Sequence, residues 1–222
     1  MTLEELIAQF RVDANDAVVP YLASDAVVTA WLNEAEHEAA IRARLISDVS
    51  TPEVCSIAIT APTTVYDLHP SILDITRAAF TPTGSTTEYC VSVVDRVEQD
   101  RTRPGWRKVT DIPRQMIQAD TQLQLGCIPS VDGVLELEVN RLPLVNIEDS
   151  PTESPSIGAI HHRHLVQWAL HKNYAIPDSE THDAGRSDKA LAEFTRVFGL
   201  RPDADYRRAT QANRQPHNKA VW

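Results

Sequence analysis

The spacing of the apolar residues changes twice along the chain. They recur at helical intervals from 2 to 47, alternate with the period of strands from about 51 to 147, and return to helical intervals from about 160. This order indicates an α+β fold, in which an N-terminal and a C-terminal helix pair form a bundle that carries an inserted antiparallel β-sandwich or small barrel. The predicted parts are a discontinuous helical domain at 1–50 and 151–199, a β-rich insert at 51–150, and an extended basic C-terminal tail at 200–222.

The predicted helices have start and stop signals. Thr2 and Glu5 have the spacing of a capping box at the start of the first helix, and Ser24 is a favourable N-cap for the second. Gly199 follows the last apolar residue of the fourth helix and is a typical stop signal. The predicted helices span about 2–17, 24–46, 160–176 and 183–198.

The insert is predicted to hold seven short strands separated by Pro, Gly, Ser and Asp residues. In two of them leucine or valine alternates with Gln or Glu, which indicates strands with one buried and one solvated face. The clearest predicted hairpin runs from Leu123 to Leu142 and turns at 129–133. The predicted strands are 55–60, 64–67, 72–81, 89–97, 116–119, 121–128 and 133–142.

The chain carries 31 acidic and 21 basic residues, a formal net charge of −10. An acidic surface disfavours nonspecific binding to nucleic acid or to anionic lipid. The seven glycines are never closer than seven residues, so the sequence holds neither a G-x-G-x-x-G dinucleotide motif nor a Walker-type phosphate loop. The sequence has no long apolar run and no basic-then-apolar N-terminus, so we expect no membrane span and no export leader.

The sequence offers little support for catalysis. It lacks the G-x-S-x-G and H-E-x-x-H patterns, and its three cysteines are too widely spaced for a C-x-x-C site. His164 and His171 are expected on one helix face near His161, which leaves a metal-dependent enzyme open as an alternative. Solvated or capping histidines are the preferred interpretation, so we expect neither an enzyme nor a cofactor.

Two basic stretches are candidate docking sites. The loop 100–108 interleaves four cations with an indole, which suits stacking on a nucleobase or contact with an anionic partner, unless Trp106 folds back over the edge of the insert. The tail 200–222 has a net charge of +3 and no apolar periodicity, so it is expected in a groove of another subunit or partner, or else against its own body. The candidate contact residues are Arg101, Arg103, Trp106, Arg107 and Lys108 in the loop, and Tyr206, Arg207, Arg208, Arg214 and Trp222 in the tail.

Several segments in this order resemble the head–tail adaptor, or connector, proteins of tailed bacteriophages. The resemblance covers about residues 1 to 200 and combines a W-L-N helix, a Y-x-L-P-like strand, a D-R-x-x-P-G-W-like loop, and a helix with the pattern L-x-x-W-A-L. These four segments are Trp31–Glu36, Tyr66–Pro70, Asp100–Trp106 and Leu165–Tyr174, and the last helix ends in Phe194–Gly199 as in that family.

The resemblance implies a structural protein of the virion neck, made in the host cytoplasm. It implies a homo-oligomeric ring, about a dodecamer, that joins the portal protein to a tail or nozzle protein. Genomic DNA would pass through the axial channel of the ring without specific binding. Our hypothesis within this family is that the C-terminal tail 200–222 docks on the portal and that the loop 100–108 faces the phage tail.

One alternative from another class stays open. A ligand- or carbohydrate-binding β-module on a helical support would have the same element order, but it would be a monomer with an exposed aromatic strip on the insert.

Overall fold

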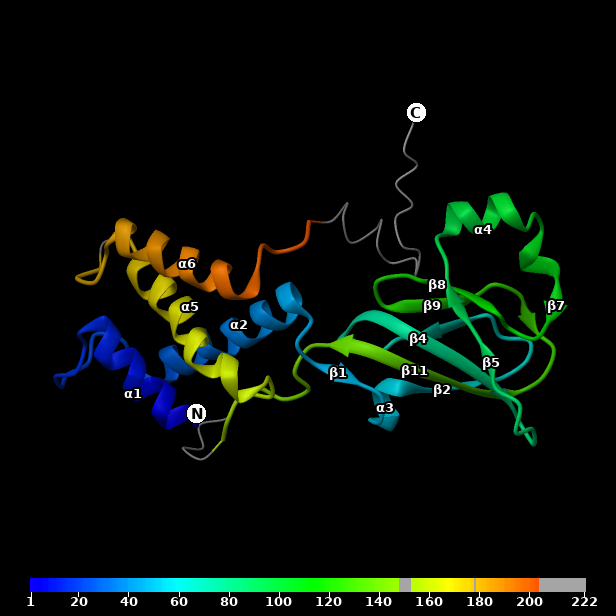
Figure 1. The fold of residues 1–222 in the computed structure, drawn as a ribbon, viewed down its shortest axis with the longest axis horizontal. Coiled ribbons are helices and arrows are strands. Elements are labelled where there is room, and N and C mark those ends of the chain that lie inside the picture. The colour runs from blue at the N-terminus through cyan, green and yellow to red at the C-terminus, as the bar shows by residue number, and fades with distance from the viewer. Residues whose placement is uncertain (148–152, 178, 204–222) are drawn as a thin grey trace. The chain divides into compact units, whose positions relative to one another are not determined.

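The computed structural model describes residues 1–147, 153–177 and 179–203. The chain forms two compact units (Figure 1). The helical unit combines Met1–Ile46 with Leu142–Arg201. The second unit contains Ser47–Arg141, which we call the β unit, and it also takes in the described residues Pro202 and Asp203. Both ends of the chain therefore contribute helices to one unit, and the α+β class predicted from the sequence is confirmed.

The helical unit is organised around its third long helix. Helix α5 contacts each of the other three, and the four helices enclose one apolar core. Leu6, Leu32, Leu165 and Phe194 are fully buried in that core. The helices are α1 (Leu3–Ala14), α2 (Asp25–Ala43), α5 (His162–Ala175), which follows the 3₁₀ turn η2 (Ala159–His161), and α6 (Ala184–Phe198). No helix in the described ranges is long and apolar enough to cross a membrane.

The cap signals in the sequence are confirmed. The Thr2 hydroxyl accepts a hydrogen bond from the backbone of Glu5, whose carboxylate accepts one from the Thr2 backbone. The Ser24 side chain caps α2. Helix α6 ends at Gly199, whose φ of +82° is in the range that favours glycine. Helix α1 is shorter than predicted, because Asn15 adopts a left-handed conformation and ends it.

The β unit contains two larger sheets and one two-stranded ladder. The first sheet has the order β1-β11-β4-β5, with β2 also paired to β11, and the second has the order β3-β9-β8-β6. The ladder joins β10 and β7 in parallel. The strands are β1 (Ser47–Asp48), β2 (Ser56–Ile59), β3 (Val65–Asp67), β4 (Ile72–Pro82), β5 (Tyr89–Cys90), β6 (Ser92–Val93), β7 (Thr110–Asp111), β8 (Gln115–Gln118), β9 (Gln122–Leu125), β10 (Ile128–Pro129) and β11 (Gly133–Arg141).

Side chains from both larger sheets form one core. Leu135, Leu137 and Val139 of β11 are buried, whereas Val134 just before them and Glu136 between the two leucines are exposed. The same core contains Leu123 and Leu125 of the second sheet. The alternation predicted from the sequence is therefore present on both strands, and it points their apolar faces at each other.

The predicted hairpin from Leu123 to Leu142 is wrong. Strand β9 pairs with β3 and β8, whereas β11 pairs with β1, β2 and β4, so residues 129–133 connect two sheets. The predicted strand 89–97 is also too long. Its last part begins helix α4 (Arg96–Thr102), because the Asp95 carboxylate caps the backbone of Val97 and Glu98. A short helix α3 (Pro52–Cys55) and the 3₁₀ turn η1 (Trp106–Lys108) complete the unit.

The first and last strands of the β unit, β1 and β11, are paired with each other, so the chain enters and leaves the unit at neighbouring positions. Strand β1 pairs antiparallel with the end of β11, and Asp48 forms an ion pair with Arg141 at 2.5 Å. The Asp48 carboxylate also accepts hydrogen bonds from the backbone of Ser50 and from the backbone and hydroxyl of Thr51. Burial raises the pKa of Asp48, but the hydrogen bonds from Thr51, Ser50 and Arg141 outweigh it and hold the pKa well below the ordinary 3.8. We call the β1–β11 pairing with this ion pair the clasp.

The Asp48→Asn variant tests the clasp through its dependence on pH. Because the folded state lowers the pKa of Asp48, its ionised form stabilises the fold above about pH 4, and this stabilisation is lost as the pH falls through the folded-state value. We expect Asp48→Asn to lower the free energy of unfolding by about 2 kcal/mol at pH 7. The deficit relative to the wild type should shrink steadily below pH 4 in urea titrations.

Glu136→Gln is the matched control, since Glu136 is exposed on β11. It should change stability by less than about 0.5 kcal/mol at every pH. A deficit of Asp48→Asn that is independent of pH would contradict the assignment.

Candidate functional site

The basic residues of the β unit are concentrated in one segment. Residues 95–114, which we call the α4 segment, carry six of the unit's eight basic residues and four acidic ones, whereas the rest of the unit carries two basic and nine acidic residues. The segment contains α4, η1 and β7, and Gly105 turns the chain between α4 and η1 with a φ of +77°. The β unit is therefore acidic with one basic region.

Asp100 organises this segment. Its carboxylate accepts a hydrogen bond from Nε1 of Trp106 at 2.8 Å and one from Nη1 of Arg107 at 2.7 Å. The Arg107 guanidinium also lies over the Trp106 ring, 4.3 Å from its centre. Hydrogen bonds from Arg107 and Trp106 lower the pKa of Asp100, so the carboxylate stays ionised near neutral pH.

Of the two alternatives that the sequence left open for Trp106, the structure agrees with the one in which the indole folds back and offers no stacking face. Its side chain is 1% exposed, so the indole belongs to the interior of the segment. The cations around it remain at the surface: Arg101 pairs with Glu98 at 2.8 Å, Arg103 pairs with Asp111 at 3.5 Å, and Lys108 is exposed. The segment therefore offers cationic side chains held in place by acidic neighbours.

A buried amide lies beneath α4. Gln99 is fully buried, and within the described part of the chain neither its Nε2 nor its Oε1 has a hydrogen-bond partner. A Cβ atom built on Gly126 would lie 3.0 Å from this Nε2 and 2.9 Å from Cβ of Gln115, so the glycine leaves room for the amide. Burying an unpaired amide costs free energy that an apolar side chain of similar size does not.

Gln99→Met is therefore expected to stabilise the protein. The substitution keeps the length of the side chain and removes the unpaired amide, so the free energy of unfolding should rise by about 1 kcal/mol in urea titrations. Gln99→Glu is the matched control, since it places a charge in the same space and should destabilise the fold. A loss of stability in Gln99→Met would show that the amide has a partner in solution.

The candidate contact residues Tyr206, Arg207, Arg208, Arg214 and Trp222 lie outside the described residues. The segment just before them is bound to the helical unit. Arg201 forms an ion pair with Glu38 at 2.9 Å, and Nη1 of Arg42 donates a hydrogen bond to the carbonyl of Gly199 at 3.3 Å. Leu200 between them is 81% exposed. The tail therefore starts from a defined position at the end of α6.

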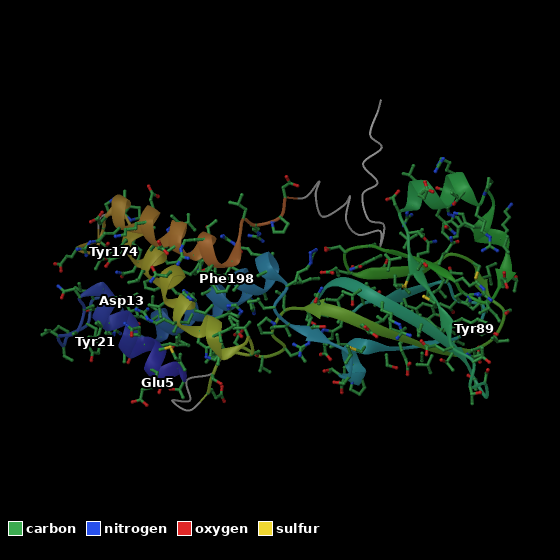
Figure 2. The ribbon with its side chains drawn as sticks, in the orientation of Figure 1. Glu5, Asp13, Tyr21, Tyr89, Tyr174 and Phe198 are labelled. Atoms are coloured by element: carbon green, nitrogen blue, oxygen red, sulfur yellow. The ribbon has the colours of Figure 1, made fainter. Side chains whose placement is uncertain are left out.

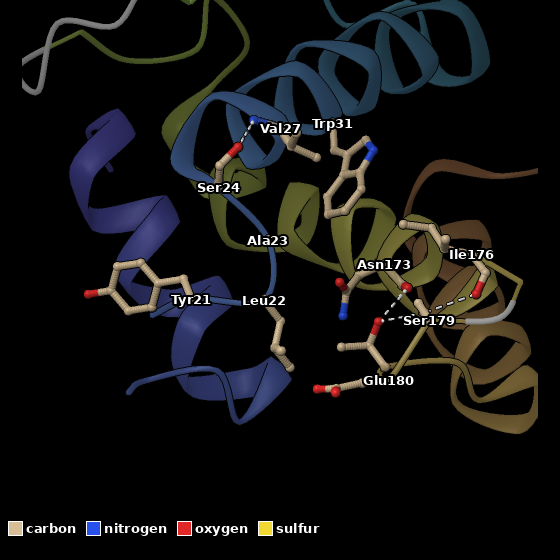
Figure 3. A pocket seen from close by; sticks show the side chains of 11 residues that line it. Tyr21, Leu22, Ala23, Ser24, Val27, Trp31, Asn173, Ile176, Ser179 and Glu180 are labelled. Carbon is tan, nitrogen blue, oxygen red and sulfur yellow. Dashed lines mark hydrogen bonds between the residues drawn. The ribbon is translucent and has the colours of Figure 1, made fainter. Parts of the chain in front are cut away.

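The helical unit contains a groove that the sequence patterns did not reveal (Figure 3). Its volume is about 580 Å³, and its walls are the loop between α1 and α2, the start of α2, the end of α5, and the segment before α6. Leu22, Val27 and Ile176 are exposed apolar side chains on these walls. The lining residues, which define the helical groove, are Tyr21, Leu22, Ala23, Ser24, Val27, Trp31, Asn173, Ile176, Ser179, Glu180 and Thr181.

One side of the helical groove is held by a buried arginine. Arg11 is 6% exposed, and its two terminal nitrogens contact Asp16 and Asp25, each at 2.5 Å. Asp16 accepts hydrogen bonds from the backbone of Leu22 at 2.9 Å and of Ala23 at 3.3 Å. These contacts, which we call the Arg11 bridge, fix the loop that carries the apolar wall. Figure 2 shows Asp13 and Tyr21 near the C-terminal end of α1. The centre of the Tyr21 ring is 4.0 Å from the Cζ atom of Arg11.

Sequence reasoning missed the groove because its walls come from both ends of the chain. The only local signal was the exposed apolar run at 18–22, between two predicted helices.

Arg11→Met is expected to destabilise the protein strongly. It leaves the buried Asp16 without its counter-charge, and breaking a buried pair in this way costs about 3–5 kcal/mol. The double variant Arg11→Met with Asp16→Asn removes both charges and should recover at least half of the loss. Thermal and urea unfolding provide the measurement, and a loss below about 1 kcal/mol in the single variant would contradict a structural role for the bridge.

The three histidines of the metal hypothesis make other contacts. His161 and His164 lie beside the Phe198 ring, with ring centres 5.7 and 6.5 Å away, and the His171 ring is within 2.8 Å of the Ser187 hydroxyl. Burial, with the nearby positive charge of Arg196, lowers the pKa of His164. Within the described ranges no group of three His, Cys, Asp or Glu side chains is arranged to hold a metal ion.

Comparison with known proteins identifies the family. No curated protein matches the chain significantly. A family model described as SU10 adaptor protein matches residues 1–216, which include both units. The chain therefore belongs to the SU10 adaptor protein family, a family of phage head–tail adaptors.

Proposed function

We propose that this chain is one subunit of a closed ring of about twelve copies that joins the portal protein to the tail and leaves an axial channel for DNA. The match to the adaptor family over residues 1–216 carries this proposal. Adaptors of this family are structural proteins of the phage virion and not enzymes. The ring, its binding to portal and phage tail, and the axial channel are what we propose for this chain.

The charge of the two units supports a channel that does not retain DNA. Residues 1–46 and 142–201 carry 16 acidic and nine basic residues, and residues 47–141 carry 13 acidic and eight basic residues. Repeated around a ring, this excess of acidic residues gives a strongly negative assembly, which repels the phosphate backbone. We propose that genomic DNA passes through the lumen without specific binding.

The two basic segments are the proposed docking sites for virion partners. The C-terminal tail of the chain is proposed to dock on the portal. Its cations would be Arg207, Arg208 and Arg214, and its aromatic anchors would be Tyr206 and Trp222. The α4 segment is proposed to face the tail or nozzle protein through Arg101, Arg103, Arg107 and Lys108. Trp106 is buried, so its proposed role is to support these cations from within the segment.

Electron microscopy of the full chain mixed with purified portal tests the ring. We expect a second ring stacked on the portal ring, with a rotational symmetry that fits about twelve copies. Dispersed monomers at micromolar concentrations of both proteins would contradict the adaptor ring and favour a monomeric β-module.

Two charge-reversal variants test which segment binds which partner. Arg207→Glu with Arg208→Glu should weaken binding to the portal at least tenfold and leave binding to the tail protein unchanged. Arg101→Glu with Lys108→Glu is the matched control. It should weaken binding to the phage tail protein and leave binding to the portal unchanged. Surface plasmon resonance with each purified partner measures both affinities. Equal losses for both partners in both variants would overturn the assignment of the segments.

A further inference from the structure

The helical groove has the properties of a docking site in its described walls. Tyr21, Leu22, Val27 and Ile176 line it and are each at least 42% exposed, and the neighbouring Val18 in the same loop is 79% exposed. A contiguous exposed apolar patch on a protein surface usually marks a site of interaction. The Arg11 bridge already holds the loop in place, so an occupant does not have to order it.

The charges of the helical groove select for a cationic occupant. Among the described residues that line it, Glu180 is the one charged residue and none is basic. Asp25 lies next to the lining residue Ser24; one of its oxygens pairs with Arg11, and its side chain is still 61% exposed. An apolar surface with acidic groups at its edge fits a segment that combines aromatic and basic side chains.

The tail of the same chain has this composition. Residues 204–222 contain four basic residues and one acidic residue, and they include Tyr206 and Trp222. No other stretch of the sequence combines net positive charge with aromatic residues and lies outside the described elements of both units.

The tail is also long enough to reach the helical groove. Thr181 of the groove lies just before α6, and Asp203 lies just after it. A helix of 15 residues is about 22 Å long, and the 19 residues from 204 to 222 span up to about 63 Å when extended. A segment tethered this closely has an effective concentration in the millimolar range, so modest contacts suffice to keep it bound.

We infer that, in the free subunit, residues 204–222 fold back and occupy the helical groove of their own chain, with Trp222 or Tyr206 against Leu22 and Ile176. The groove is then covered until assembly. This inference goes beyond the proposed function but connects with it. If the C-terminal tail docks on the portal as proposed, the portal and the helical groove compete for the same residues. Docking then uncovers the apolar surface of the groove on each subunit.

Hydrogen–deuterium exchange of the full chain without portal tests the inference. In the wild type, backbone amides of residues 204–222 should exchange at least threefold more slowly than in the Leu22→Ser variant. Leu22 is 57% exposed, so this substitution is expected to leave the fold intact, which circular dichroism checks. A full-length variant with Tyr206→Ser and Trp222→Ser should in turn speed exchange in the loop 17–24, before α2.

Two matched controls make the result specific. Val12→Ser changes a valine that is 70% exposed and does not line the groove, and Asn213→Ser changes a polar residue of the tail. Both variants should leave both exchange rates unchanged. Identical exchange of the tail in the wild type, Leu22→Ser and Val12→Ser would overturn the inference. Protection that grows with protein concentration would also overturn it, because the tail would then occupy a second copy. Since no portal is present, the outcome is independent of whether the tail docks on the portal.

Discussion

The β unit depends on strand β11, because this strand forms backbone hydrogen bonds along both of its edges. Strand β4 pairs with it from Gly133 to Arg141 on one edge, and β1 and β2 share the other. Its buried side chains at alternate positions reach the core that the second sheet also lines. A slip of one residue would turn all of these side chains to the solvent. The register of one strand therefore fixes the first sheet, the shared core, and the place where the chain leaves the unit.

Patterns in the sequence predict local features better than pairings between distant segments. The capping box at Thr2 and the stop at Gly199 depend on a single helical turn, and both are present. Alternation around Leu123 predicts correctly which face is buried, but it carries no information about the neighbouring strand, so the predicted hairpin was wrong. The candidate site follows the same rule. The cations of the α4 segment were visible in the sequence, whereas the burial of Trp106 and the Arg11 bridge arise only from tertiary packing.

The two candidate docking surfaces are held by different kinds of contact. The α4 segment relies on ion pairs such as Arg107–Asp100 and Arg101–Glu98, in which at least one partner is well exposed to solvent and therefore to screening by salt. The helical groove relies on the buried pair of Arg11 and Asp16, which salt reaches much less. The shape of the groove is thus a fixed property of the helical unit, while the cations of the α4 segment can exchange their acidic neighbours for those of a partner. This difference suits one surface to shape recognition and the other to charge recognition.

The clasp has a consequence for how such proteins diversify. In an antiparallel pair, facing Cα atoms are only about 5 Å apart, so the chain leaves the β unit almost where it enters it. An inserted domain whose ends lie close together can be lengthened, exchanged or deleted with little disturbance to the domain that receives it. The helical unit requires only that the two connecting points stay together. A helical scaffold of this kind can therefore receive inserts of different size and shape at the same two connecting points.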